Sequence, residues 1–175
     1  YLFLEGTFRN DWSSTLSRAN RSFFYPSVSL SWGITDMFSH LGKRLPEWIT
    51  YSKLRASYAE VGNDLEPYQL TNDYLIKPVP SDNTTTVARQ DILFDDNVRS
   101  ELIKSWEVGA ELKLFDGRLG FDLSWYKSNA TRQLLNLPMD NLSGYKSRKI
   151  NAGDIQNTGV ELQVTARPIE LASGF

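Results

Sequence analysis

A strict alternation runs through Ser105-Trp106-Glu107-Val108-Gly109-Ala110-Glu111-Leu112-Lys113-Leu114, in which every second residue is apolar. After Asp116-Gly117 the alternation resumes over Leu119-Gly120-Phe121-Asp122-Leu123-Ser124-Trp125-Tyr126. Successive side chains of a β-strand point to opposite faces of a sheet. An alternation of this length therefore predicts two strands, each with one apolar and one polar face.

The dipeptide Asp116-Gly117 indicates how the two strands pair. It favours a two-residue type I′ turn, because Gly tolerates positive φ and the twist of that turn matches the twist of the strands. The turn then sets four apolar pairs opposite one another: Leu114 with Leu119, Leu112 with Phe121, Ala110 with Leu123, and Val108 with Trp125. All four pairs lie on one face, so the turn and the alternation predict the same register. The other face sets Glu111 against Asp122 and must be hydrated.

The same period recurs elsewhere in the chain. It is clear in Val28–Ile34 and Val160–Ala166, and weaker in Leu54–Tyr58 and Tyr1–Arg9. No segment shows a helical period over about a dozen residues. The sequence therefore predicts an all-β chain with about six antiparallel strands.

The connections between these strands alternate in length. Asp116-Gly117 and residues 35–48 are short, whereas residues 10–21, 63–100 and 129–156 are long and rich in Asn, Asp, Ser, Thr and Pro. Loops longer than about 12–15 residues are uncommon in compact domains. Because every second connection is long, we expect the short ones at one end of the sheet and the long ones at the other.

The composition excludes several classes of function. The chain has 175 residues, with 19 Lys and Arg against 21 Asp and Glu, and this near-neutral balance argues against a nucleic-acid partner. With no Cys and one His, thiolate zinc sites, disulfide frameworks, Cys nucleophiles and paired-His metal motifs are excluded. No run of about 18 apolar residues is present, which excludes a transmembrane helix.

Two environments could explain the apolar face. One is a soluble β-sandwich, in which the face packs on a second sheet. The other is a transmembrane β-barrel, in which the face contacts lipid. Alternating segments of about 10 residues with short turns at one end and long loops at the other favour the barrel. We expect Trp106 and Trp125 at the long-loop ends of their strands, where an interfacial aromatic girdle would lie.

Five motifs carry a family resemblance: Phe24-Tyr25-Pro26-Ser27-Val28-Ser29-Leu30-Ser31-Trp32; Leu54-Arg55-Ala56-Ser57-Tyr58 followed by Val61-Gly62-Asn63; residues 105–119; residues 127–135; and Asn151-Ala152-Gly153-Asp154-Ile155-Gln156-Asn157-Thr158-Gly159-Val160-Glu161. In this order they resemble the SusC/RagA-type TonB-dependent transporters of Bacteroidetes outer membranes. The matches cover most of the chain. Each motif alone is weak, but five in the family's order are specific.

The resemblance implies a transporter rather than an enzyme, situated in the bacterial outer membrane as a multi-pass β-barrel. In that family a barrel of about 22 strands holds a plug and pairs with a SusD-like surface lipoprotein. Oligosaccharides or peptides are imported with energy from TonB–ExbBD. Residues 1–175 are then expected to form part of a single transmembrane β-barrel domain, with the plug domain and TonB box absent from them. No cofactor or metal ion is expected.

Two alternatives remain open. A TonB-dependent receptor for siderophores or cobalamin would work without the lipoprotein, and the motifs above disfavour it. A soluble β-sandwich that binds carbohydrate belongs to a different class and would need no detergent.

Candidate ligand contacts lie in the long loops. The aromatic residues could stack on sugar rings or anchor a peptide: Trp12, Tyr68, Tyr74 and Tyr145. Polar neighbours could hydrogen-bond hydroxyl groups or peptide backbone: Asn72, Asp73 and Arg89. The same residues could instead pack the loops together or contact the lipoprotein.

Two acidic clusters also occur in the sequence. Glu107, Glu111 and Asp122 share the polar face but are interpreted as a hydrated wall rather than as catalytic carboxylates. The acidic group Asp91, Asp95 and Asp96 fits no calcium-loop pattern and is interpreted as a solvated loop.

Overall fold

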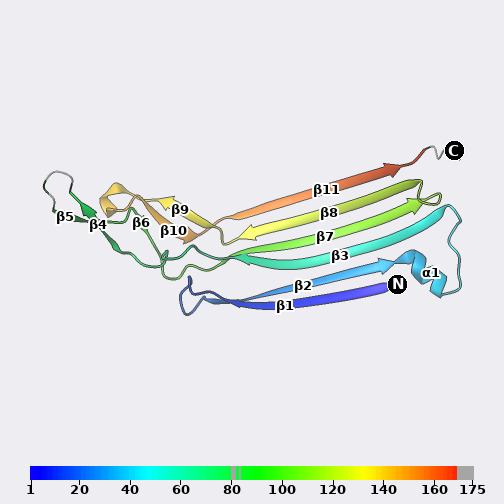
Figure 1. Ribbon diagram of the computed structural model, residues 1–175, viewed down its shortest axis with the longest axis horizontal. Coiled ribbons are helices and arrows are strands. Elements are labelled where there is room, and N and C mark those ends of the chain that lie inside the picture. The colour runs from blue at the N-terminus through cyan, green and yellow to red at the C-terminus, as the bar shows by residue number, and fades with distance from the viewer. Residues whose placement is uncertain (80–81, 83, 169–175) are drawn as a thin grey trace, which may run out of the picture.

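The computed structural model describes residues 1–79, 82 and 84–168. Its main element is a six-stranded antiparallel sheet of long strands, in the order β1-β2-β3-β7-β8-β11 (Figure 1). The strands are β1 (Leu2–Trp12), β2 (Ser22–Gly33), β3 (Ile49–Asn63), β7 (Glu101–Leu114), β8 (Leu119–Thr131) and β11 (Asp154–Ala166). Each strand pairs with its neighbour in this order, so the prediction of about six antiparallel strands is confirmed.

The predicted hairpin register is also correct. Leu112 lies opposite Phe121 and Val108 opposite Trp125, as the Asp116-Gly117 turn requires. Asp116 and Gly117 have φ of 56° and 79°, and the Arg118 amide donates to the Phe115 carbonyl at 3.1 Å. Positive φ at both central residues is the mark of a type I′ turn.

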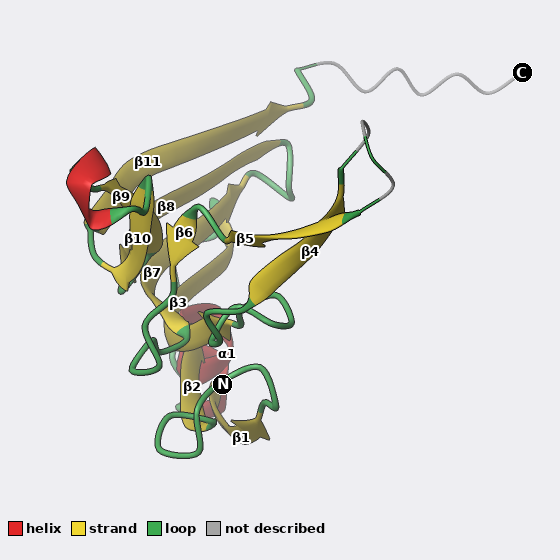
Figure 2. Cartoon of the chain, turned by 90° about the vertical axis from the view of Figure 1, so that its left-hand side faces the viewer, coloured by secondary structure: helices red, strands yellow, loops and turns green. Residues whose placement is uncertain are grey.

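The long connections carry small elements of their own, which the sequence did not predict. A hairpin is formed by β4 (Tyr74–Pro78) and β5 (Thr85–Arg89), and a second sheet by β6 (Ile92–Leu93), β10 (Ser147–Asn151) and β9 (Leu134–Pro138), with a 3-10 turn at Asn141–Ser143. In Figure 1 they all lie beyond the left-hand ends of the long strands, and Figure 2 shows the β4–β5 hairpin projecting away from β9 and β10. We call these two connections, residues 64–100 and 132–153, the rim.

The short connections lie at the opposite end, as expected (Figure 1). One is the β7–β8 turn. The other contains a seven-residue helix, α1 (Ile34–His40), which the sequence analysis missed. About two helical turns are too short to produce a recognisable period of 3.6 residues.

The buried core is small and lies at the base of the rim. Leu16, Leu65 and Val98 are almost fully buried, and Phe23 and Leu134 are among the residues packed against them. Within the described residues, by contrast, no second sheet pairs with or lies over the apolar face of the long strands. Leu4 and Val160 on that face are 73% and 66% exposed. The structure therefore lacks the packed second layer that a β-sandwich requires.

Candidate functional site

The apolar face forms a continuous band across all six long strands. One row of mutually paired residues consists of Leu4, Leu30, Ala56, Val108, Trp125 and Val160. Aromatic side chains lie at the edge of the band nearest the rim, where the ring centroids of Tyr58 and Trp106 are 4.5 Å apart. One step further along β3 and β7 on this face come Glu60 and Lys104, whose side chains form an ion pair at 3.2 Å.

The expected position of the two tryptophans is wrong in one respect. Trp106 and Trp125 do not lie at strand ends, because β7 begins at Glu101 and β8 continues to Thr131. They lie instead at the edge of the apolar band, inside strands that run on toward the rim. The apolar pattern marks where the band stops, whereas the backbone pairing continues through polar residues that carry no such pattern.

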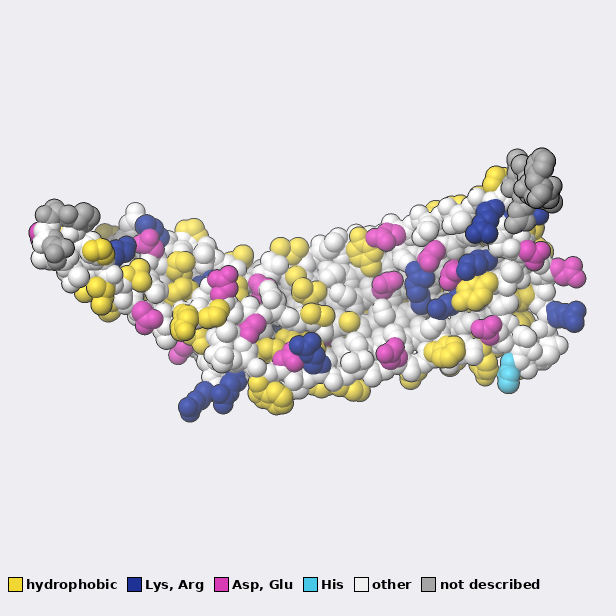
Figure 3. Space-filling model, in the orientation of Figure 1, with side chains coloured by type: hydrophobic (Ala, Val, Ile, Leu, Met, Phe, Trp, Pro, Cys, Tyr) yellow, Lys and Arg dark blue, Asp and Glu magenta, His cyan; other side chains and the backbone are white. Residues whose placement is uncertain are grey.

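The opposite face is polar and built mostly from small side chains. Serines occupy it on β2, β3, β7 and β8: Ser27, Ser29, Ser31, Ser57, Ser105 and Ser128. Figure 3 shows this face, with charged side chains of both signs gathered over the half of the sheet near the short connections. A face of this kind suits contact with water or with another polar surface.

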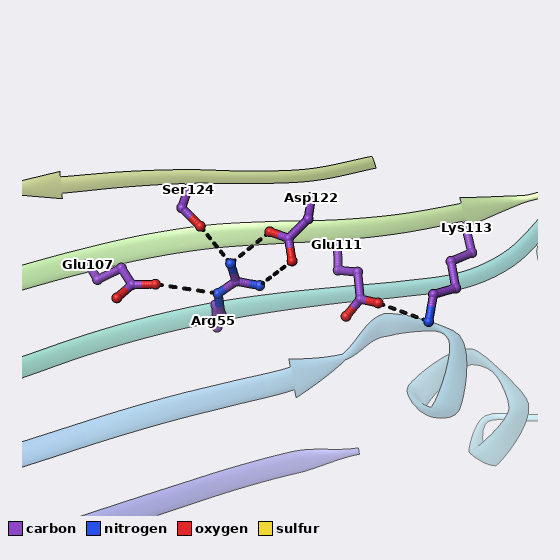
Figure 4. Close-up of polar contacts among 6 residues, drawn as sticks. All are labelled: Arg55, Glu107, Glu111, Lys113, Asp122 and Ser124. Atoms are coloured by element: carbon purple, nitrogen blue, oxygen red, sulfur yellow. Dashed lines mark hydrogen bonds and ion pairs between the residues drawn. The ribbon is translucent and has the colours of Figure 1, made fainter. Parts of the chain in front are cut away.

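The centre of the charged group is Arg55 (Figure 4). Its guanidinium donates to both carboxylate oxygens of Asp122, at 2.7 and 3.1 Å, and to the Ser124 hydroxyl at 2.6 Å. On its other side Glu107 lies 3.6 Å from Nε. A bidentate contact of this kind fixes both the orientation and the charge of the carboxylate.

Arg55 reaches these partners by crossing a strand. It belongs to β3 and Asp122 to β8, and Gly109 of β7 lies between them, paired with Arg55 on one side and Ser124 on the other. A Cβ atom on Gly109 would lie 2.5 Å from the Nε of Arg55. The glycine therefore opens the path along which the guanidinium crosses β7.

Three acidic residues on this face, Glu107, Glu111 and Asp122, are paired with cations. Glu107 and Asp122 pair with Arg55, as described above, and Glu111 forms an ion pair with Lys113 at 3.0 Å. Glu111, Lys113 and Asp122 border a depression of about 320 Å³ near the β7–β8 turn, which is also lined by Gln163 and Arg167. Carboxylates neutralised in this way form a mixed-charge wall, which agrees with the interpretation of Glu107, Glu111 and Asp122 as part of a hydrated wall.

Three of the seven candidate ligand residues lie together in the rim. Tyr74 of β4 pairs with Arg89 of β5, and the Arg89 guanidinium lies 4.1 Å from the centre of the Tyr145 ring. Arg89 also donates to the Gly144 carbonyl at 2.6 Å. We call Tyr74, Arg89 and Tyr145 the aromatic cluster; it combines two rings and a cation within the rim.

The other four candidates lie outside the aromatic cluster. The Asn72 side chain bonds both backbone groups of Phe94, at 2.8 and 3.0 Å, and so holds the loop together. Asp73 accepts from the Thr71 hydroxyl. Trp12 was expected in a loop but is the last residue of β1, paired with Ser22, because β1 extends further than its alternation. Trp12 and Tyr68 are 72% and 88% exposed.

Sequence reasoning missed the ion pairs that join the two longest connections. Lys146 bonds Asp91 at 2.7 Å, and Arg148 pairs with Asp95. The Lys146 ammonium lowers the pKa of Asp91. The Asn97 amide and then Arg148 lower the pKa of Asp95. The partners are more than 50 residues apart in sequence, so no local pattern could have indicated them.

The described part of the chain contains no group of three or more His, Asp or Glu side chains placed to hold a metal ion. Asp91 and Asp95 are instead neutralised by basic side chains.

No helix in the described segments is long and apolar enough to cross a membrane.

Comparison with known proteins identifies the architecture. The model of a family described as "TonB dependent receptor-like, beta-barrel" matches residues 1–175. The chain belongs to this family. TonB-dependent receptors are outer-membrane β-barrels that act as transporters and not as enzymes, so the apolar band is the lipid-facing side of a barrel wall.

Individual relatives support the SusC/RagA resemblance. The chain is 29% identical over 166 residues to TonB-dependent receptor P3 of Formosa agariphila, covering 93% of the chain and 16% of that protein. It is 27% identical over 183 residues to TonB-dependent receptor SusC of Bacteroides thetaiotaomicron, covering 97% and 17%. The chain therefore spans about one sixth of the length of these curated relatives.

Solved structures share the fold. The RagAB peptide importer in its 'closed-closed' state matches with a TM-score of 0.84 at 22% identity, covering 98% of this chain and 18% of that one. The siderophore receptor PirA from Pseudomonas aeruginosa matches with a TM-score of 0.56 at 14% identity, covering 92% and 27%.

Proposed function

We propose that the chain is one side of the barrel of a SusC/RagA-like importer, which takes up oligosaccharides or peptides together with a SusD-like surface lipoprotein. The observation that carries the proposal is the alignment with SusC over 97% of the chain. The fold shared with the RagAB peptide importer supports it. On this view residues 1–175 belong to one barrel domain, and TonB–ExbBD acts through a plug formed elsewhere in the protein.

The rim is the part of the chain suited to meet cargo. All of its long connections gather at one end of the wall (Figure 1), and the aromatic cluster there combines rings for stacking with a guanidinium for hydrogen bonding. Trp12 and Tyr68 add exposed rings, whereas Asp73 adds an acceptor. Such side chains suit a sugar or a peptide equally, and both cargo classes belong to the proposal.

Growth measurements test the cargo. A strain lacking the complete protein is complemented with wild type or with the double substitution Tyr74→Ala and Tyr145→Ala, and is grown on defined oligosaccharides or peptides as the limiting nutrient. We expect slower growth of the double variant on one of the two cargo classes. His40→Ala, at the opposite end of the wall, serves as the control. Normal growth of the deletion strain on both classes contradicts the proposal.

Co-purification tests the lipoprotein partner. Replacing residues 75–88 with a short Gly-Ser linker removes the projecting hairpin but leaves Tyr74 and Arg89 in place. We expect less SusD-like lipoprotein to co-purify with this variant than with wild type. Undiminished co-purification shows that the hairpin is not a docking element.

A siderophore receptor is the competing function. The PirA structure matches with a lower TM-score than RagAB, 0.56 against 0.84. Impaired growth of the deletion strain under iron limitation alone, with normal growth on both nutrient classes, favours that competitor.

A further inference from the structure

On β8 and β11 the lipid-facing band ends in a group of polar side chains. Lys127 follows Trp125 on the same face of β8, and its backbone pairs with Trp106 on one side and Thr158 on the other. The next paired row toward the rim contains Lys104, Asn129 and Gln156. These polar residues therefore directly adjoin the aromatic edge of the band.

The charge of Lys127 is unbalanced. Lys104 on the neighbouring strand pairs with Glu60, which also accepts a hydrogen bond from the Tyr58 hydroxyl. Among the residues that the structure describes, Lys127 makes no ion pair or hydrogen bond through its ammonium group. Beside it the Gln156 amide donates to the Thr158 hydroxyl at 3.4 Å, which leaves the hydroxyl proton of Thr158 free to be donated outward.

An ammonium group next to a lipid-facing tryptophan needs water or an anion at the same depth, because hydrocarbon cannot solvate it. The long apolar stem of lysine can lie along the band while its head reaches the interface. At an interface reached from a lipid-facing surface, the anion at hand is the phosphate of a lipid headgroup.

We propose that Lys127, with the Thr158 hydroxyl beside it, binds the phosphate of an anionic membrane lipid whose acyl chains lie on Trp125 and Val160. Charge complementarity supplies the recognition of the headgroup, and continuity with the lipid-facing band supplies the seat for the chains. The site is on the face away from the polar wall, so it is independent of the cargo and of the lipoprotein partner.

Native mass spectrometry of the complete protein in neutral detergent tests this site, with phosphatidylglycerol as the anionic probe and phosphatidylcholine as the zwitterionic one. We expect wild type to retain phosphatidylglycerol preferentially. Lys127→Gln should weaken that retention about fivefold, the equivalent of about 1 kcal/mol for one lysine at an anionic surface. Lys127→Arg should preserve it, and Lys53→Gln, on the polar face, should leave it unchanged.

Three results would contradict the lipid site. Equal retention of phosphatidylglycerol by wild type and Lys127→Gln overturns the proposal, as does equal retention of the two lipids by wild type. Displacement of the lipid by inorganic phosphate alone assigns a free-anion site instead of a lipid site. Heat-modified migration in gels checks that each variant is folded. If Lys127→Gln does not fold, Lys127→Arg still allows a comparison with wild type.

Discussion

Because Gly109 has no side chain, the Arg55 guanidinium can cross β7 on the polar face of the wall. The glycine lies under the guanidinium of Arg55, which crosses β7 to reach Asp122 and Ser124 on β8. Three strands are thereby tied together by one side chain on the polar face. The arrangement needs both a long planar donor on β3 and an empty position on β7.

Gly109→Ala should destabilise the barrel. The new Cβ would lie 2.5 Å from Nε and 2.7 Å from Cζ of Arg55, so the guanidinium must leave its partners. We expect a loss of about 1–3 kcal/mol, as for other overpacked sites, measured by urea unfolding in lipid vesicles. Gly120→Ala on β8 is the control, because its Cβ would meet Thr165 at an ordinary 3.7 Å. Equal stability of the two variants contradicts the crossing.

A pair of adjacent residues on β11 tests which face meets lipid. Leu162 belongs to the lipid-facing band, paired with Leu123, whereas Gln163 lies on the polar face opposite Asp122. Leu162→Arg should impair assembly, because arginine near the bilayer midplane costs about 2–4 kcal/mol. Gln163→Arg should be tolerated. The folded yield in a vesicle refolding assay compares them, and identical yields would refute the face assignment.

Sequence reasoning at this scale could predict faces but not contacts. The alternation put Arg55 on the side away from Leu54 and Ala56, and Asp122 on the side away from Phe121. It could not show that these two charged residues meet, because their strands are brought together by β3–β7 pairing across the connection 64–100. Periodicity is local, whereas this contact depends on long-range pairing.

Among the elements, the rim is organised by charge as well as by apolar packing. The three-stranded sheet joins β6 to β10 in parallel, and the ion pairs of Asp91 with Lys146 and Asp95 with Arg148 lie beside this pairing. Asn151 adds hydrogen bonds to both backbone groups of Arg99. The two long connections therefore form one body over the small core of Leu16, Leu65 and Val98.

Acid should loosen this body. Asp91 and Asp95 have pKa values below their usual range in the folded protein. Their contribution to stability is therefore complete above the ordinary pKa of about 4 and is lost as the pH falls through the folded values. We expect faster hydrogen exchange of the β10 amides at low pH, after correction for the intrinsic exchange rate.

Asp95→Asn should reproduce part of that loosening at neutral pH, because the amide cannot balance the charge of Arg148. Asp73→Asn is the control, since among the described residues its carboxylate accepts a hydrogen bond only from the nearby Thr71. If the β10 amides of Asp95→Asn exchange at the wild-type rate, the ion pair does not hold the two connections together.

The elements that could be predicted are those long enough to show a period. The six strands of the wall meet that condition, and the Asp-Gly dipeptide at residues 116–117 indicated the turn between two of them. Strand β6 has two residues and β4, β5, β9 and β10 five each, and in strands this short chance alternation cannot be told from a pattern. The strands of the wall also run past their apolar stretches, which is why Trp12 was assigned to a loop.

At the scale of the whole molecule, the wall is an open sheet with β1 and β11 at its edges. In a closed barrel both edges are paired, so we expect the backbone groups of these two edge strands to pair with further strands. The barrel also explains the wide exposure of the apolar face, because lipid rather than a second protein layer covers that face.

The complete protein should therefore depend on detergent. Removal of detergent should cause the protein to aggregate, because large apolar side chains are exposed across the lipid-facing band. Size-exclusion chromatography with light scattering would detect the aggregates. Exchange into amphipathic polymer, which also covers apolar surface, should keep it monodisperse. A monodisperse species in plain buffer contradicts the lipid-facing assignment.

The unequal connections also have a consequence for how the rim can vary. Closing a flexible loop costs entropy that grows only with the logarithm of its length, about 0.6 kcal/mol for each doubling. The connection at 64–100 is about three doublings longer than the turn at 115–118, a difference of about 2 kcal/mol. Insertions at exposed turns outside the sheets and ion pairs of the rim therefore add little loop-closure entropy, and new surface loops can arise there while the register of the wall stays the same.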